Sequence, residues 1–260
     1  MAAFVMEPVV GAALSGAVPD PRYLTAVREI CDRHGVLLIA DEVMTGFGRT
    51  GRRLAWQHWN AQPDIAIVGK AMSGGYFPLS GVLTTERIAE PLRASHSYFE
   101  NGQTHLFSAL GAAVGAYVLA RIARDGLVER AHALGERLRE KLAPMLAMPI
   151  IGDVRGLGLM TGIEFVRDKS SRAPFSPDLA MARRFARAAI EQGVVVYPST
   201  GGARSLAGDH LLLLPPLTVS ESDIDCAAAS LVHAAKELSA RLEDEACHAP
   251  RSASFARDGS

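Results

Sequence analysis

Two short stretches decide the fold: Leu-Leu-Ile-Ala-Asp-Glu-Val at residues 37–43 and Ile-Val-Gly-Lys-Ala-Met-Ser-Gly-Gly at residues 67–75. In each stretch, an apolar run typical of a buried strand ends near one charged residue, Asp41 in the first and Lys70 in the second. A charged side chain at the end of a buried strand needs a partner or a chemical role. The pattern therefore predicts buried strands that present one carboxylate and one amine.

Helical and strand patterns alternate around these two stretches. A helix is predicted to begin at Asp20-Pro21, where Asp caps and Pro fits the first turn, and to end at Gly35. The other predicted elements of this half are strands at 1–7, 36–40, 65–68 and 80–85 and helices at 108–123 and 127–142. This alternation predicts an α/β fold with a mainly parallel sheet.

The pattern changes at Met148-Pro149, where we place a domain boundary. Residues 149–245 are predicted to form a smaller α+β domain, with strands at 150–154, 159–165, 194–197 and 211–214 and helices at 177–192 and 221–242. Residues 246–260 are polar, small and aperiodic, so we expect them to form a disordered tail.

The composition is that of a globular protein and excludes several function classes. The 260 residues are 48% hydrophobic and 21% charged, with a formal net charge of −1 and with lysines and arginines spread along the chain. We therefore expect no nucleic-acid partner and no membrane partner. No apolar run approaches the ~20 residues that span a bilayer. The three cysteines are scattered, without disulfide or metal spacing, which predicts a cytoplasmic protein with no metal site.

The amine and the carboxylate suit an aldehyde cofactor with a basic ring nitrogen, which is the chemistry of pyridoxal phosphate. Lys70 is the candidate catalytic residue, because a lysine holds this cofactor covalently and then moves a substrate proton as acid and base. Asp41 is the candidate partner of the ring nitrogen. The separation of 70 − 41 = 29 residues allows a loop, a crossover and a return on the neighbouring strand. Alternatively, Lys70 is a solvated charge and Asp41 a helix cap or salt-bridge partner.

Three motifs occur in a characteristic order: Asp-Glu-Val-Met-Thr-Gly-Phe-Gly-Arg-Thr-Gly at 41–51, Pro-Asp-Ile at 63–65 and Gly-Lys-Ala at 69–71. They resemble the class III aminotransferases (omega-aminotransferases and relatives), pyridoxal-phosphate enzymes of fold-type I. The resemblance continues through residues 101–105, 156–159 and 214–217. It implies that residues 1–148 are the remainder of a cofactor-binding large domain whose N-terminal part is absent. The chain would then be the C-terminal portion of a longer aminotransferase.

The resemblance also implies roles for further residues. Val43 would lie against the cofactor ring, which is close to a simple prediction of core packing. Thr104 would donate its hydroxyl to the cofactor phosphate of a neighbouring subunit, which implies a homodimer; an ordinary helix N-cap fits the same local sequence. Glu42 is expected to have a structural partner, and Arg49 is expected to organise the glycine-rich loop by hydrogen bonds.

Two residues are candidates for the substrate side. The resemblance places Glu7, at the end of the first strand, near the substrate or the cofactor hydroxyl, or in a pair with an arginine. Arg204, in the glycine-rich stretch 201–208, is a candidate mobile binder of a substrate carboxylate, or an exposed loop arginine.

The resemblance implies a transaminase that moves an amino group between an amine or omega-amino acid and a keto acid. The Gly-Asp-His-Leu-Leu pattern at 208–212 looks most like the amine and omega-amino-acid transaminases. Two alternatives remain open at this point. One is an aminomutase of the glutamate-semialdehyde type, which shares these motifs, and the other is a truncated fragment without catalysis.

Overall fold

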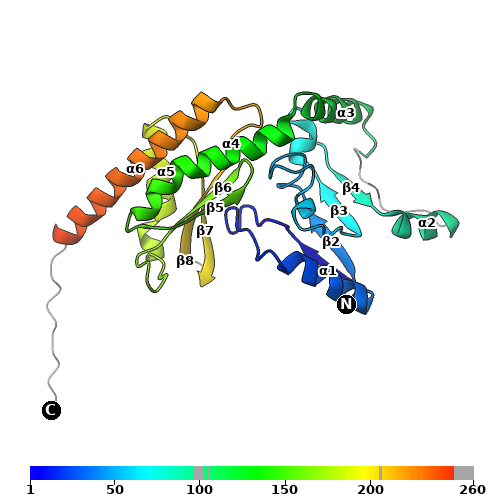
Figure 1. Cartoon of the computed structure of the whole chain (residues 1–260), viewed down its shortest axis with the longest axis horizontal. Coiled ribbons are helices and arrows are strands. Elements are labelled where there is room, and N and C mark those ends of the chain that lie inside the picture. Colours follow the sequence, from blue (N-terminus) through cyan, green and yellow to red (C-terminus); the bar gives the residue numbers. More distant parts are fainter. Residues whose placement is uncertain (96–101, 103, 105, 205–206, 249–260) are drawn as a thin grey trace, which may run out of the picture.

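The computed structural model describes residues 1–95, 102, 104, 106–204 and 207–248, and it contains two four-stranded sheets (Figure 1). The first sheet has the order β1-β2-β3-β4 and the second the order β5-β6-β8-β7. The strands are β1 (Ala3–Met6), β2 (Leu37–Asp41), β3 (Ile65–Val68), β4 (Gly81–Thr84), β5 (Ile151–Leu157), β6 (Met160–Phe165), β7 (Tyr197–Arg204) and β8 (Ala207–Leu213). The α-helices are α1 (Tyr23–His34), α2 (Glu86–Ala94), α3 (Ala109–Arg124), α4 (Leu127–Leu142), α5 (Met181–Glu191) and α6 (Glu221–His248).

The first sheet confirms the predicted α/β class. Strands β1, β2 and β3 are parallel neighbours, and β4 joins β3 in the antiparallel direction. Helix α1 connects β1 to β2 and ends where predicted, at Gly35, whose φ of 63° is the left-handed conformation that glycine adopts easily. The start of α1 differs from the prediction. Arg22 occupies the cap position, and Asp20 accepts a hydrogen bond from its N–H at 2.9 Å.

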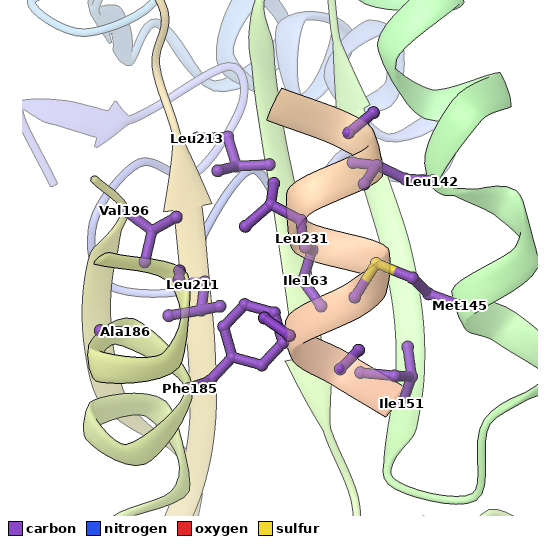
Figure 2. Packing of buried hydrophobic residues seen from close by; sticks show 14 of the residues in the cluster. Leu142, Met145, Ile151, Ile163, Phe185, Ala186, Val196, Leu211, Leu213 and Leu231 are labelled. Carbon is purple, nitrogen blue, oxygen red and sulfur yellow. The ribbon is translucent and has the colours of Figure 1, made fainter. Parts of the chain in front are cut away.

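The second sheet is antiparallel and buries one face under helices (Figure 1). The apolar residues of α4, α5 and α6 form one continuous core with those of β6 and β8. Figure 2 shows Phe185 of α5, Leu231 of α6 and Leu211 of β8 pointing toward one another in this core. Phe185 is fully buried, with its ring 5.2 Å from the ring of Phe165.

The opposite face of the second sheet is covered by the segment of residues 9–17, which follows β1 and which we call the strap. Val9 of the strap packs with Met160 and Leu212, and the Ser15 hydroxyl lies 2.7 Å from His210 Nδ1. A Cβ at Gly162 would lie 1.7 Å from the Ser15 carbonyl oxygen, so only glycine lets the strap approach this closely. The strap therefore joins the two sheets.

Several elements differ from the sequence-based expectations. Strand β7 begins at Tyr197 instead of Val194, because its ladder with β8 starts at the Tyr197–Leu212 pair. Helix α5 begins at Met181, after a short 3-10 turn at Pro177–Leu179. Helix α6 extends to His248, three residues into the predicted tail, and residues 249–260 lie outside the described part. Helix α2 was not predicted. Among the described helices, none combines the length and apolar character that crossing a membrane requires.

The packing of helix α4 is relevant to the position of the domain boundary. Its residues Ala131, Leu134, Leu138 and Leu142 belong to the core of the second sheet. The boundary near Met148 stays a prediction, and this packing favours an earlier division near Gly126, the residue before α4.

Candidate active site

Lys70 lies just beyond the carboxyl end of β3. Gly69 follows the strand in an extended conformation, and Lys70 then opens a short 3-10 helix, Lys70–Ser73. The backbone of Lys70 has a φ of 43°, in the left-handed region that residues with a side chain adopt rarely. Such a conformation persists only where the surrounding structure imposes it, and it is concentrated at functional sites.

Asp41 is the last residue of β2, the parallel neighbour of β3. In the ladder it lies opposite Ile67, three residues before Lys70. Asp41 is half-buried, and its Oδ1 accepts a hydrogen bond from the Val43 N–H at 3.0 Å. Since the carboxyl ends of parallel strands meet at one edge, Asp41 and Lys70 belong to the same edge of the sheet, where α/β proteins place their ligands.

Val43 lies beside the residue that precedes Lys70. A Cβ built at Gly69 would lie 3.6 Å from Val43 Cγ1, which is ordinary contact distance. The loop after β2 therefore packs against the start of the turn that carries Lys70. The structure thus brings Asp41, Val43 and Lys70 together.

Lys70 opens onto a cavity of about 630 Å³, which we call the Lys70 cavity. Its walls come from the loop after β2, the turn after β3, helix α3 and the segment after β8: Met44, Arg49, Lys70, Ala71, Gly74, Gly75, Tyr76, Tyr117, Val118, Arg121, Ile122, Asp125, Leu127, Leu214, Pro216, Leu217 and Thr218. Asp41 is not part of these walls. The sequence stretches 70–76 and 214–217, which belong to separate motifs, meet here.

Helix α3 supplies polar groups that sequence reasoning missed. Arg121 Nη2 lies 2.7 Å from Asp125 Oδ2, and Arg121 Nη1 lies 3.4 Å from the Tyr117 hydroxyl oxygen. These bonds to Tyr117 and Asp125 raise the pKa of the Arg121 guanidinium. The spacing of Tyr117, Arg121 and Asp125 by four residues was a usable signal, since it places them on one helix face.

Glu42 has the structural partners that were expected. It is fully buried and accepts hydrogen bonds from the N–H groups of Ala55 and Trp56, both at 2.9 Å, and from the Thr45 hydroxyl. Burial raises the pKa of the Glu42 carboxyl, and these hydrogen bonds oppose that effect. Glu42 therefore anchors the loop that follows Asp41.

Arg49 reaches farther than the loop it was expected to organise. It donates to the carbonyl oxygens of Leu159 at 3.0 Å and Pro215 at 2.6 Å, both in the second half of the chain. Burial lowers its pKa to about 10. A Cβ at Gly158 would lie 2.5 Å from the Arg49 carbonyl oxygen, so this contact between the halves also requires glycine. Arg49 thus ties the edge that carries Asp41 to the second sheet.

Glu7 lies next to this edge but outside the lining of the Lys70 cavity. Its Oε2 accepts a hydrogen bond from the Gly11 N–H at 2.8 Å. A Cβ at Gly11 would lie 2.9 Å from this oxygen and 2.5 Å from the sulfur of Met44, which does line the cavity. Glu7 therefore lies behind Met44, which forms part of the cavity wall.

Thr104 is not among the described residues that line the Lys70 cavity. Thr104 is exposed, and the alternative of a helix cap is wrong for it, because Ser108 caps α3 and accepts from the Gly111 N–H at 3.2 Å. Arg204 was placed in a loop but is the last residue of β7, opposite Ala207. The glycines there serve an irregularity in the β7–β8 ladder, with positive φ at Gly201 and Gly202. The Arg204 side chain lies outside the described part.

Comparison with known proteins agrees with this geometry. The model of the family "Aminotransferase class-III" matches residues 1–235. An uncharacterized aminotransferase, YodT, of Bacillus subtilis is 38% identical over 226 residues, which cover 86% of this chain and 51% of that protein. The adenosylmethionine-8-amino-7-oxononanoate aminotransferase of Nitratidesulfovibrio vulgaris is 35% identical, over 90% of this chain and 41% of that protein.

Solved structures show the same fold. A transaminase from the marine bacterium Virgibacillus superposes with a TM-score of 0.86 at 32% identity, over 92% of this chain and 54% of that chain. An (S)-enantioselective omega-transaminase from Thermomicrobium roseum superposes with a TM-score of 0.82 at 34% identity, over 91% of this chain and 51% of that chain. The chain spans about half the length of the curated relatives it matches. The family match, the shared fold and the Asp41–Lys70 edge agree, and the chain belongs to the class-III aminotransferases.

Proposed function

We propose that this chain carries the catalytic lysine of a pyridoxal-phosphate-dependent transaminase that moves an amino group between an amine or omega-amino acid and a keto acid. The observation that carries the proposal is Lys70 itself. It sits in a left-handed conformation at the carboxyl end of β3, beside Asp41 on the neighbouring strand, and it opens onto the Lys70 cavity.

The donor set fits the cofactor. A primary amine and a carboxylate at two adjacent strand ends are the two groups that hold the aldehyde carbon and the ring nitrogen of pyridoxal phosphate. When bound, the cofactor supplies an electron sink for the substrate carbon. Val43 would pack against the ring, and Thr104 would hold the phosphate of a partner subunit in a homodimer. We place this enzyme in the cytoplasm.

Lys70 and Asp41 have separate tasks in this proposal. The Lys70 amine would hold the cofactor, and it would also act as the base that takes a proton from the substrate carbon and as the acid that gives the proton back. The Asp41 carboxylate would keep the ring nitrogen of the cofactor protonated. Glu42 holds the loop that follows Asp41, through its hydrogen bond from the Ala55 N–H. The Val43 N–H donates to the Asp41 carboxylate and so fixes its orientation. The described charged residues of the cavity wall are Arg49, Lys70, Arg121 and Asp125, an excess of positive charge that favours an anionic keto acid.

Borohydride trapping tests the assignment of Lys70. The purified chain is incubated with pyridoxal phosphate, reduced with borohydride and mapped by peptide mass spectrometry. We expect the added mass on Lys70 and none on the other lysines of the sequence, Lys141, Lys169 and Lys236. Lys70→Arg is the variant that removes the reactive amine and keeps the charge. A label on Lys141, Lys169 or Lys236 would contradict the proposal.

Asp41→Asn tests the second task. We expect the cofactor to remain bound through Lys70 while the transamination rate falls at least about 100-fold, since the ring nitrogen loses its anionic partner. Because the chain spans half of its relatives' length, this rate is measured in a protein that carries the whole family fold around these residues. Near-normal turnover would exclude the role of Asp41. Product analysis with and without an added keto acid separates the transaminase from the aminomutase alternative.

A further inference from the structure

A second hollow lies where the loop after Thr50 meets the first turns of α4. It has a volume of about 690 Å³ and shares no described lining residue with the Lys70 cavity. We call it the basic hollow. It is lined by Gly51, Arg52, Arg53, Trp56, Gln57, His58, Asn60, Val128, Glu129 and His132.

The basic hollow carries more cationic than anionic groups. Arg52 and Arg53 are exposed, and within the part of the chain that the structure describes neither takes part in an ion pair. His58 adds a group that becomes cationic on protonation, and Glu129 is the acid among the described lining residues. His132 also lines the hollow, and its Nε2 lies 3.5 Å from the Glu136 carboxylate. The 16-residue helix α4 begins at Leu127, so the positive end of its dipole also lies at this hollow. Together these groups give the hollow more positive than negative charge.

The hollow is held in shape by close packing. Gly51 has a φ of 82°, and a Cβ there would lie 2.9 Å from His132 Cβ, so the loop touches α4 directly. His58 ends a 3-10 helix, Ala55–His58, whose first N–H groups donate to the buried Glu42 carboxylate. The loop that carries the two arginines is therefore fixed at both of its ends. A fixed loop lowers the entropy cost of binding a ligand.

His58 links the hollow to proton binding. Its Nε2 lies 3.0 Å from the Thr50 carbonyl oxygen, an acceptor, so Nε2 carries a hydrogen in the neutral ring. In that ring Nδ1 is an acceptor and repels an anion, whereas the protonated ring donates from Nδ1. Burial lowers the pKa of His58, the Thr50 bond opposes this, and the positive charges of Arg52 and His132 lower it further. An anion placed among these groups would raise it again.

We propose that the basic hollow binds a small dianion of the phosphate type, held by Arg52, Arg53 and the imidazole of His58, with uptake of a proton on binding. Guanidinium groups make the strongest hydrogen bonds to such anions. Free phosphate and the phosphate group of a small organic molecule share this chemistry. The proposal does not depend on the transaminase function, because no residue of the basic hollow holds the amino group or the cofactor in that function.

Calorimetric titration of the full chain with inorganic phosphate tests the site. We expect Arg52→Gln/Arg53→Gln to weaken phosphate binding at least about tenfold, since two charge-assisted contacts are lost. Glu129→Gln should tighten binding, because it removes the opposing acid; a misfolded variant would not give this gain. Arg33→Gln, an exposed arginine on α1, is the matched control and should leave the affinity unchanged. Circular dichroism confirms that each variant is folded.

Sulfate isolates the proton linkage, because phosphate groups titrate near pH ~6 themselves whereas sulfate stays a dianion across the histidine range. We expect sulfate affinity to fall as pH rises through the His58 pKa, and the NMR titration of His58 to move to higher pH with sulfate bound. Parallel titrations with a phosphate monoester distinguish a phosphorylated metabolite, bound more tightly, from the free ion. Unchanged phosphate affinity in Arg52→Gln/Arg53→Gln would overturn the proposal. So would loss of phosphate binding when pyridoxal phosphate loads Lys70, since the anion would then belong to the Lys70 cavity.

Discussion

The second sheet packs one face on α4, α5 and α6 and the other on the strap, whereas the first sheet leaves much apolar surface exposed. In the first sheet, Leu38 and Val68 are buried, but Val5 of β1 is 59% exposed and Val82 of β4 is 67% exposed. The second sheet instead contributes Ile163, Leu211 and Leu213 to a continuous core. Burial of apolar area is the main favourable term in folding, so the stability of this chain resides mainly in the second sheet.

The proposed chemistry lies in the other half, at the first sheet. Asp41 and Lys70 stand at the edge of the weakly packed sheet, and the left-handed backbone of Lys70 has to be imposed by its surroundings. Arg49 and the strap are the connections through which the stable half supports that edge. The candidate site therefore depends on contacts between the two halves of the chain more than on the packing of its own sheet.

The largest effect is expected in the core of the second sheet. Phe185→Ala removes a fully buried ring in contact with Phe165 and should lower the free energy of unfolding by about 3–5 kcal/mol. Urea denaturation followed by circular dichroism measures the change. A loss below about 1 kcal/mol would show that stability is not concentrated here.

Replacing Arg49 should make the two halves of the chain unfold at different urea concentrations. Arg49→Met leaves the Leu159 and Pro215 carbonyl oxygens without their charged donor and should cost about 2 kcal/mol. The chain's two tryptophans, Trp56 and Trp59, both report on the first half, so their fluorescence should change at lower urea than the circular dichroism signal. Arg52→Met, an exposed arginine in the same loop, is the control. Coincident transitions in Arg49→Met would contradict this view of Arg49.

Acid should weaken the contact between the strap and the second sheet. Burial lowers the pKa of His210 from its ordinary 6.5, and the nearby Arg155 charge lowers it further. The folded chain therefore favours neutral His210, and this stability is complete above pH 6.5 and lost as pH falls through the lowered value.

His210→Gln should flatten that part of the pH profile of unfolding free energy, by less than the Arg49 effect. Denaturation curves at several pH values measure it. His34→Gln, at the exposed end of α1, controls for removing a histidine. An identical acid slope in wild type and His210→Gln would rule out the contribution of this residue.

The smallest effect is expected on the exposed strand of the first sheet. Val82→Thr on β4 should change the free energy of unfolding by less than about 0.5 kcal/mol, because the side chain is already in water. The same exchange at Val196, which is 8% exposed in the core of the second sheet, should cost about 1–3 kcal/mol by burying a hydroxyl. Equal costs at the two positions would remove the contrast between the sheets.

Much of the fold followed from local patterns. The β3 boundaries were predicted to the residue, and the apolar spacing from Leu127 to Leu142 predicted helix α4, because such patterns are set by residues within a turn or two of one another. The start of β7 and the location of Arg204 were predicted wrongly, since valines favour a strand locally while the pairing with β8 decides where the ladder runs. Helix α2 has no buried residue, so its sequence gave little core pattern to detect.

The order of residues was enough to identify the family, through the motifs at 41–51, 63–65 and 69–71. It also predicted the pair Asp41–Lys70, because a charge at the end of each buried strand is visible in that order. The packing of the elements showed that Arg49 donates hydrogen bonds to residues 110 and 166 positions away, and that α4 belongs to the core of the second sheet. It also decided that Tyr117 and Arg121 face the same cavity as Lys70. Local patterns encode which face of an element is apolar, but the choice among distant partners depends on how all the elements pack together.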